Sequence, residues 1–405
     1  MQFILKIVRS KPFDALMATL FGALVGAVVF GILWVLQELI LVQMLGLEQP
    51  SIVTNLVLPG LAALLILGLA AFGFASGLGM FRGTSLGKFL YYGSSTALFR
   101  GFVGMAIAFA FGLALFNLLS NLFGAEPVAL LELTEGGMVF AGIVSVIGFM
   151  FGSGAITDWI LWIFGYETPL HHGAPEGKPE WFRYFTADVN HKVIGIQYGI
   201  TSLIVLLVGG LFAVIFRIEL AQPGMQWLTN DQYNTLFSAH GIVMIASILL
   251  GVGAMVNYLV PIMIGASDMA FPRLNAFSFW VAIPSVLLIL GGMAVGGWDT
   301  GWVGYPTLSL ATPKVGVLLF LLGFWMNGFS SIASAINMIV TTVTMRAPGM
   351  TPFRMPIFVW GALGAAIIQF TSTQTVGVAL TSSILERAYG LTFFDPAYGG
   401  NPILY

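Results

Sequence analysis

Residues 239–264 read AHGIVMIASILLGVGAMVNYLVPIMI, and this stretch decides the fold. It contains no Asp, Glu, Lys or Arg, and an α-helix of this length crosses the roughly 30 Å hydrocarbon core of a bilayer. Lipid offers the backbone no hydrogen-bond partner, so such a segment spans as a helix. It also contains one histidine, His240. An imidazole inside a membrane is a candidate functional group, whose partner is either a metal or a neighbouring helix.

The composition of the whole chain agrees with this segment. Of 405 residues, 58% are hydrophobic and 8% are charged, and the mean hydropathy is +0.95. Ordinary soluble domains have roughly 25% charged residues. The absence of cysteine excludes disulfides, thiolate-bound metals and iron–sulfur clusters within the chain. The net charge of -2 does not indicate any class of partner, and since no basic run suggests nucleic acid, none is expected as a partner.

Apolar stretches of about 20 residues predict about nine membrane-spanning helices, and therefore an all-α polytopic transmembrane helix bundle. We expect these helices at residues 15–41, 52–78, 99–122, 138–164, 193–216, 239–264, 277–295, 315–343 and 357–385. The first follows a basic segment that imitates a signal peptide. This apolar stretch is too long for a signal peptide and has no small-residue cleavage site, so we expect the helix to be retained.

The basic residues between these helices predict an orientation. With nine helices and a cytoplasmic N-terminus, twelve of the fifteen basic residues fall on the cytoplasmic side, as the positive-inside rule requires. They are Lys6, Arg9, Lys11, Arg82, Lys88, Arg100, Lys178, Arg183, Lys192, Arg273, Arg346 and Arg354. Only Arg217, Lys314 and Arg387 fall on the opposite side, where acidic residues predominate.

A polar connector predicts two domains. Residues 166–190 have the composition of a solvated cytoplasmic linker between a four-helix membrane extension, residues 1–165, and a five-helix core, residues 191–405. Within the linker, His171 and His172 form a candidate surface metal site. No third ligand follows at a suitable spacing, so an exposed loop is the favoured interpretation. The extension is rich in small residues, which favours a role in helix packing or assembly.

From Thr186 onward the sequence resembles subunit I of the haem–copper respiratory oxidases, the family of cytochrome c and quinol oxidases. The most specific stretch is PIMIGA at 261–266 followed by DMAFPRLN at 268–275. Others are NHKVIG at 190–195, RIELAQPG at 217–224, DQYN at 231–234, SAH at 238–240, SSIASAIN at 330–337, MRAPGMT at 345–351 and FFDP at 393–396, with the pairs Gly301-Trp302 and Tyr305-Pro306.

The resemblance implies a low-spin haem, of type a or b, on the histidine. His240 matches one of the two axial ligands of its iron, a task suited to a neutral imidazole in an apolar shell. Arg217 and Tyr233 match residues that bond to or pack on the same haem. Trp302 and Tyr305 match residues near it, although aromatic residues are common at any membrane interface. No catalytic residue is expected in this chain itself.

The resemblance also implies a proton path. Asp268 matches the carboxylate at the mouth of the family's main path, and the residues matching its lining are Asn257, Asn275, Ser330, Ser331 and Asn337. Each one separately is explained equally well as a hydrogen bond between helices. Between His240 and Asn257 the chain is two residues shorter than the family pattern. Such a deletion rotates the rest of a helix by about 200°, which would turn Asn257 away from the path.

The whole enzyme implied by this resemblance reduces dioxygen to water with electrons from cytochrome c or quinol, and pumps protons. It would lie in a prokaryotic cytoplasmic membrane with oxidase subunits II and III. The three copper-binding histidines and the ligand of the second haem are absent here, so copper and that haem are expected only in the complete subunit. The alternatives are a nitric oxide reductase-like enzyme, which generally lacks the Asp268 path, and a haem-free assembly scaffold or transporter.

Overall fold

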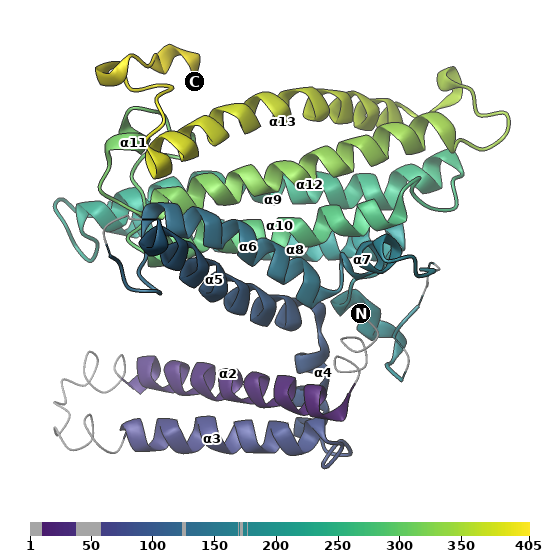
Figure 1. The fold of residues 1–405 in the computed structure, drawn as a ribbon. Helices are drawn as coiled ribbons and strands as arrows, with labels where there is room; N and C mark the ends of the chain where they lie inside the picture. Colours follow the sequence, from purple (N-terminus) through teal and green to yellow (C-terminus); the bar gives the residue numbers. More distant parts are fainter. Residues whose placement is uncertain (1–9, 38–57, 124–126, 169, 171–172, 176) are drawn as a thin grey trace. The chain divides into compact units, whose positions relative to one another are not determined.

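The computed structural model describes residues 10–37, 58–123, 127–168, 170, 173–175 and 177–405 (Figure 1). Within these ranges the regular structure is entirely helical. Contacts divide the chain into two compact units, Met1–Arg100 and Gly101–Tyr405. His171 and His172 lie outside the described residues, so their interpretation as an exposed loop stays a prediction.

The first unit is a helical hairpin with a short third helix. Helices α2 (Lys11–Gln37) and α3 (Leu58–Gly77) pack along their length, and α4 (Ser85–Ser95) follows. A side chain at Gly22 would overlap the backbone of Leu69, and one at Gly73 would overlap that of Ala18. The two backbones therefore touch, as small residues permit in membrane helices. Helix α4 begins at a cap in which the Thr84 hydroxyl accepts from the amide of Gly87 at 3.0 Å.

The second unit is built from long, laterally packed helices (Figure 1). They are α5 (Ala97–Leu122), whose first four residues belong to the other unit, α6 (Glu135–Ser153), α8 (His191–Glu219), α9 (Asn230–Ile264), α10 (Pro272–Ala294), α12 (Gly316–Thr344) and α13 (Ile357–Tyr389). The closest pairs are α8 with α9, α10 with α12, and α12 with α13. Shorter elements are α7 (Thr157–Ile163), α11 (Leu308–Ala311) and the 3-10 helices Glu180–Phe185, Pro352–Arg354, Pro396–Tyr398 and Pro402–Leu404.

The described helices confirm an all-α polytopic bundle. Eight of them are long and apolar enough to cross a membrane, and Leu61–Gly77 forms a shorter apolar helix where the second span was predicted. The predicted helix at residues 138–164 is wrong as a single element. It ends at Ser153 because Gly154 adopts a left-handed conformation, φ 85°, and α7 follows as a separate short helix.

The long helices of the second unit run alternately between two ends. Asp268 lies at the end where α8 begins and α9 stops, which we call the Asp268 end. His240 lies toward the opposite end, where α8 stops and α9 begins, and we call this the His240 end. Helix α9 begins with a complete capping box, in which Thr229 and Gln232 bond each other's backbone amides.

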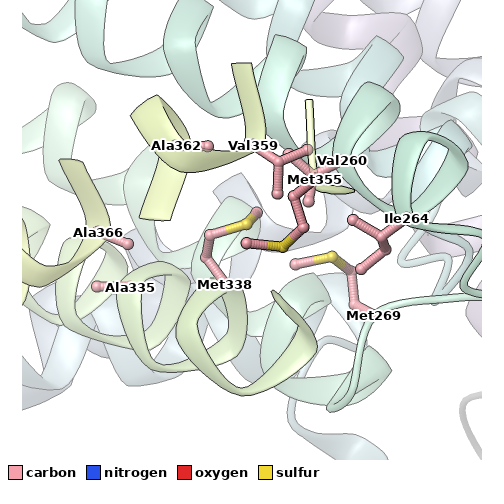
Figure 2. Packing of buried hydrophobic residues seen from close by; sticks show 9 residues of the cluster. All are labelled: Val260, Ile264, Met269, Ala335, Met338, Met355, Val359, Ala362 and Ala366. Carbon is pink, nitrogen blue, oxygen red and sulfur yellow. The ribbon is translucent and has the colours of Figure 1, made fainter. Parts of the chain in front are cut away.

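A methionine-rich core fills the Asp268 end. Met269, Met338 and Met355 are almost fully buried, and Figure 2 shows their side chains converging between Val260, Ile264 and Val359. An unbranched thioether chain adapts to irregular gaps, here between α9, α12 and α13. Met269 directly follows Asp268, so this core anchors the loop that carries Asp268.

Helix α6 is part of the same bundle as the predicted core. Within its most apolar window 61% of the residues are buried, the same share as in α10 and α12, whereas α8 has 17%. Phe149 packs against Trp280 of α10 with ring centroids 6.3 Å apart. A side chain at Gly142 would overlap Leu322 of α12. The residues before the predicted linker thus contribute a helix to the interior of the second unit.

An ion pair fastens α6 to α13 at the His240 end. Nη2 of Arg387 lies 2.9 Å from Oε1 of Glu135, and Nη1 donates to the carbonyl of Ser309 at 2.7 Å. The side chain of Arg387 is only 4% exposed. The hydroxyl of Tyr389 adds a hydrogen bond to the carbonyl of Gly136 at 3.3 Å.

Replacement of Arg387 by methionine should destabilise the bundle by about 3 kcal/mol, because it leaves the Glu135 carboxylate and two carbonyls without their donor. The apparent Tm of the purified protein in detergent measures this loss. Arg354→Met is the matched control, since Arg354 is exposed and makes a single bond to Gly349. Equal melting temperatures for the two variants would contradict the structural role of Arg387.

Candidate functional site

His240 is held by α8. Its Nδ1 lies 2.8 Å from the backbone carbonyl of Gly209. A carbonyl oxygen can only accept, so Nδ1 carries a proton, and in the neutral ring Nε2 keeps a free lone pair. The bond satisfies one nitrogen of the ring and fixes the orientation of the other. This is the arrangement in which a protein histidine commonly binds a metal, with a carbonyl fixing its tautomer.

One aromatic side chain packs against this imidazole, and others lie nearby. Phe216 of α8 packs edge-on against His240, with centroids 5.5 Å apart, and also touches Tyr233 at 5.9 Å and Phe237 at 6.2 Å. Trp302 covers the helix beside the histidine, because Gly241 has no side chain: a Cβ there would lie 3.0 Å from that of Trp302. Tyr233 therefore reaches the imidazole only through Phe216, and Trp302 lies beside the residue that follows His240.

Two other residues that the sequence analysis assigned to the haem, Arg217 and Tyr305, are exposed. Arg217 follows Phe216 on α8, is exposed, and has no hydrogen bond or ion pair among the residues described. Its guanidinium is therefore free to take an anionic group. Tyr305 is 62% exposed and packs against Tyr405, with ring centroids 5.8 Å apart. Within the described chain it makes no ring contact with His240.

Asp268 lies at the beginning of α8. Its Oδ1 accepts from the backbone amide of His191, the first residue of that helix, at 3.3 Å, and from the amide of Met269 at 2.7 Å. The positive end of a helix dipole favours a charged carboxylate. The side chain is partly exposed, so that a charged, water-accessible carboxylate marks this end of the unit.

A cavity of about 570 Å³ lies between α9, α12 and α13. Asn257, Ser330 and Ser331 line it, and so does Met269, the neighbour of Asp268. The shortening of the sequence between His240 and Asn257 therefore does not turn Asn257 away from the cavity. The amide of Asn257 donates to the carbonyl of Gly253 at 2.8 Å, while its Oδ1 is buried without a protein partner.

The other two predicted asparagines do not line this cavity. Asn337 forms two hydrogen bonds with the backbone of Phe271: its Oδ1 accepts from the amide at 2.9 Å, and its Nδ2 donates to the carbonyl at 3.0 Å. This asparagine therefore braces the loop of Asp268 against α12. Asn275 is buried, and neither atom of its amide has a protein partner.

Buried polar atoms gather near the Asp268 end. Oδ1 of Asn257, both polar atoms of the Asn275 side chain and Oε1 of Gln197 are buried without protein partners. Leaving such an atom without any hydrogen bond is costly, and native proteins meet this need with ordered water. The arrangement favours a hydrated interior at this end.

Tyr198 belongs to this polar region, although the sequence analysis did not single it out. Its hydroxyl donates to Oγ of Ser278 at 3.1 Å and lies 3.5 Å from Oγ of Ser334. Ser330 donates to the carbonyl of Ser278 at 2.6 Å. A tyrosine in the middle of an apolar helix needs a partner for its hydroxyl, and this signal was available in the sequence.

Two glutamates hold the loops at the His240 end. Glu219, the last residue of α8, accepts from the amides of residues 226–228 at 2.6 to 3.1 Å. Glu386 of α13 accepts from the amides of residues 393–395 at 2.8 to 3.1 Å. The motif RIELAQPG therefore contains the glutamate that holds the loop after α8. The motif FFDP contains the backbone amides that Glu386 holds.

Comparison with known proteins gives the family. The sequence model described as "Cytochrome C and Quinol oxidase polypeptide I" matches residues 193–405. Cytochrome c oxidase subunit 1 of Thermostichus vulcanus is 39% identical over 241 residues, which cover 59% of this chain and 44% of the relative. That of Synechocystis sp. is 41% identical over 229 residues, covering 56% and 42%. That of Corynebacterium diphtheriae is 41% identical over 237 residues, covering 56% and 41%.

The chain thus spans less than half the length of these curated relatives. The match begins at the first turns of α8 and continues through α13, so it includes His240, Asp268 and every other site residue predicted from the sequence. Haem and copper are characteristic of these respiratory membrane oxidoreductases. The chain belongs to the subunit I family of the cytochrome c and quinol oxidases.

Proposed function

We propose that this chain supplies a haem ligand and the proton entrance of a terminal oxidase that reduces dioxygen to water and pumps protons. The hydrogen bond from His240 to Gly209 is the observation that carries this proposal. In the neutral imidazole this bond leaves Nε2 free, beside the ring of Phe216, and such a nitrogen is the donor that a low-spin haem of type a or b takes as an axial ligand. The bound haem would supply one-electron transfer.

The neighbouring residues are suited to hold such a group. Phe216 packs against the imidazole, Tyr233 packs against Phe216, and Trp302 lies beside Gly241; apolar surroundings of this kind would tune a bound haem. The free guanidinium of Arg217 would bond to an anionic edge of the haem. Tyr305 would lie farther out, at the surface of the His240 end.

Asp268 would collect protons for the reaction. Its carboxylate is accessible at one end of the unit, and the cavity lined by Asn257, Ser330 and Ser331 begins beside Met269. Water in this cavity, together with the hydroxyl of Tyr198, would carry protons inward. Asn337 would act by bracing the loop, and Asn275 by bonding to water.

The charges of the second unit support an orientation with the Asp268 end in the cytoplasm. The basic residues that lie within or next to helices at that end are Lys178, Arg183, Lys192, Arg346 and Arg354. At the His240 end, Lys314 is paired with Asp231 at 3.1 Å and with Asp299 at 3.7 Å, and Arg387 is paired with Glu135. This end therefore carries little unpaired positive charge, as the positive-inside rule expects for the outer side of a prokaryotic cytoplasmic membrane.

The remaining parts of the enzyme would come from outside this sequence. The chain has four histidines, of which His191 is buried with its Nδ1 bonded to the carbonyl of Asn257. Four histidines cannot supply both the ligand of the low-spin haem and a site of three copper-binding histidines with a second haem. We therefore assign copper and the second haem to the complete subunit, and expect no oxygen consumption by the 405 residues alone. Cytochrome c or quinol would donate the electrons, and oxidase subunits II and III would be the partners.

We propose that the chain consists of an extension at residues 1–165, a cytoplasmic linker at 166–190 and the oxidase core at 191–405. The extension would stabilise the core, since α6 packs against α10, α12 and α13. Its ion pair with Arg387 supports this role.

A visible spectrum of membranes that contain the complete subunit tests the proposal. We expect a low-spin haem band in the reduced-minus-oxidised difference spectrum of these membranes, together with cyanide-sensitive oxygen uptake. When the enzyme is reconstituted in vesicles, we expect acidification of the outside medium. Consumption of nitric oxide without pumping would identify a nitric oxide reductase instead. Membranes with normal levels of the protein and no haem band would indicate the haem-free scaffold or transporter.

A further inference from the structure

The extension contacts the core where α10 begins. Asp158 of α7 places its Oδ2 3.1 Å from Nε of Arg273, in the first turn of α10. The same guanidinium donates from Nη2 to the carbonyl of Thr168. One arginine of the core is therefore held from two sides by residues 157–168, which precede the residues matched by the oxidase family.

Aromatic packing places α7 at the same point. Trp159 stacks on Phe277 of α10, with ring centroids 5.2 Å apart and an angle of 28° between the rings. Trp159 and Leu170 also form one side of a shallow hollow, whose other side is residues 270–274. The extension thus covers the first turn of α10 independently of the ion pair, and this packing remains when the pair is broken.

The loop of Asp268 runs directly into that turn. Asp268 itself is bonded to the start of α8, and the amides of Ala270 and Phe271 are held by Thr341 and Asn337 of α12 at 2.9 Å each. Arg273 follows Asp268 by five positions and is the first charged residue after it. The loop therefore has anchors on α8 and α12, and its next charged side chain is held by the extension.

We propose that Asp158 is a positioning residue of the proton entrance, which keeps the positive charge of Arg273 away from Asp268. Without Asp158, the guanidinium would keep the carbonyl of Thr168 but lose its anionic partner, and the carboxylate of the adjoining loop would take that place. An Asp268 paired with Arg273 would take up protons from the water less readily in each turnover, because a nearby positive charge favours the deprotonated carboxylate. The inference rests on the proposed function of Asp268.

The assembled oxidase with Asp158→Asn tests this role. We expect turnover to fall about 3- to 10-fold, the size of coupling found between residues of one contact network, and fewer protons to be pumped per electron. Asp158→Glu should restore both values, since it keeps the charge. The double variant Asp158→Asn with Arg273→Gln should also recover most of the turnover, because no free arginine then remains beside Asp268.

Glu135→Gln is the matched control. It breaks the other ion pair between the extension and the core, at the His240 end, and should lower stability while the protons pumped per electron stay at the parent value. An equal loss of pumping in Glu135→Gln and Asp158→Asn would overturn the inference, as it would indicate a general effect of docking. So would parent values in Asp158→Asn when Asp268→Asn, measured in parallel, loses pumping. Parent values in Asp268→Asn would instead overturn the proposed function itself.

Discussion

Replacement of His240 by alanine should remove the low-spin haem band from the spectrum of the assembled oxidase and lower its turnover by at least about 100-fold, the upper range for losing even an indirect contact to a metal ligand. The reason is the free Nε2 that the bond to Gly209 leaves on the ring. Alanine has no donor for the iron. The reduced-minus-oxidised spectrum measures the loss directly, at equal amounts of inserted protein.

A second substitution separates ligand loss from misfolding. His240→Gln keeps a side-chain amide that can still donate to the carbonyl of Gly209, and Phe216 still has a planar group to pack against. We expect normal insertion and no low-spin band in this variant too. Ser238→Ala, two positions earlier on α9, removes a bond to the amide of Gly301 and should leave the spectrum intact. An unchanged low-spin band in either His240 variant would disprove the assignment.

The sequence predicted the helices well because lipid reduces the choice of structures. A segment of 20 apolar residues in a bilayer must be helical, so composition alone was sufficient for most of them. The exception, residues 138–164, shows what hydropathy does not detect. Gly154 stops α6 by its left-handed backbone, and the apolar run continues through α7 without a change in composition. A glycine between two helices leaves no signal in a hydropathy profile that already contains many glycines.

The sites could be predicted only as far as the family resemblance carried them. It indicated His240, Tyr233 and Trp302, but not Phe216, whose ring lies against both His240 and Tyr233. It could not show whether an asparagine points into a cavity or braces a loop, because that depends on the rotation of each helix. Asn257 lines the cavity, whereas Asn337 bonds the backbone of Phe271. For the same reason the partner of Asp158, 115 positions away in sequence, was beyond reach.

Substitution of Asp268 by asparagine should abolish proton pumping and slow turnover by about 100-fold, the lower range for the loss of a positioned proton-transferring group. An amide oxygen can still accept from the backbone of His191 and Met269, so the loop and the start of α8 keep their structure. What is lost is the ability to bind and release a proton at that point. Haem content should therefore be unchanged, which distinguishes this variant from His240→Ala.

The measurement is the number of protons released per electron by oxidase reconstituted in vesicles. Asp231→Asn is the control: it also removes a carboxylate near a helix start, but Asp231 is 79% exposed at the His240 end, and its one ion pair within the described part of the chain is with Lys314. An exposed pair of this kind contributes little, so pumping should match the parent. If Asp268→Asn pumps as many protons per electron as this control, the carboxylate caps α8 and takes no part in proton uptake.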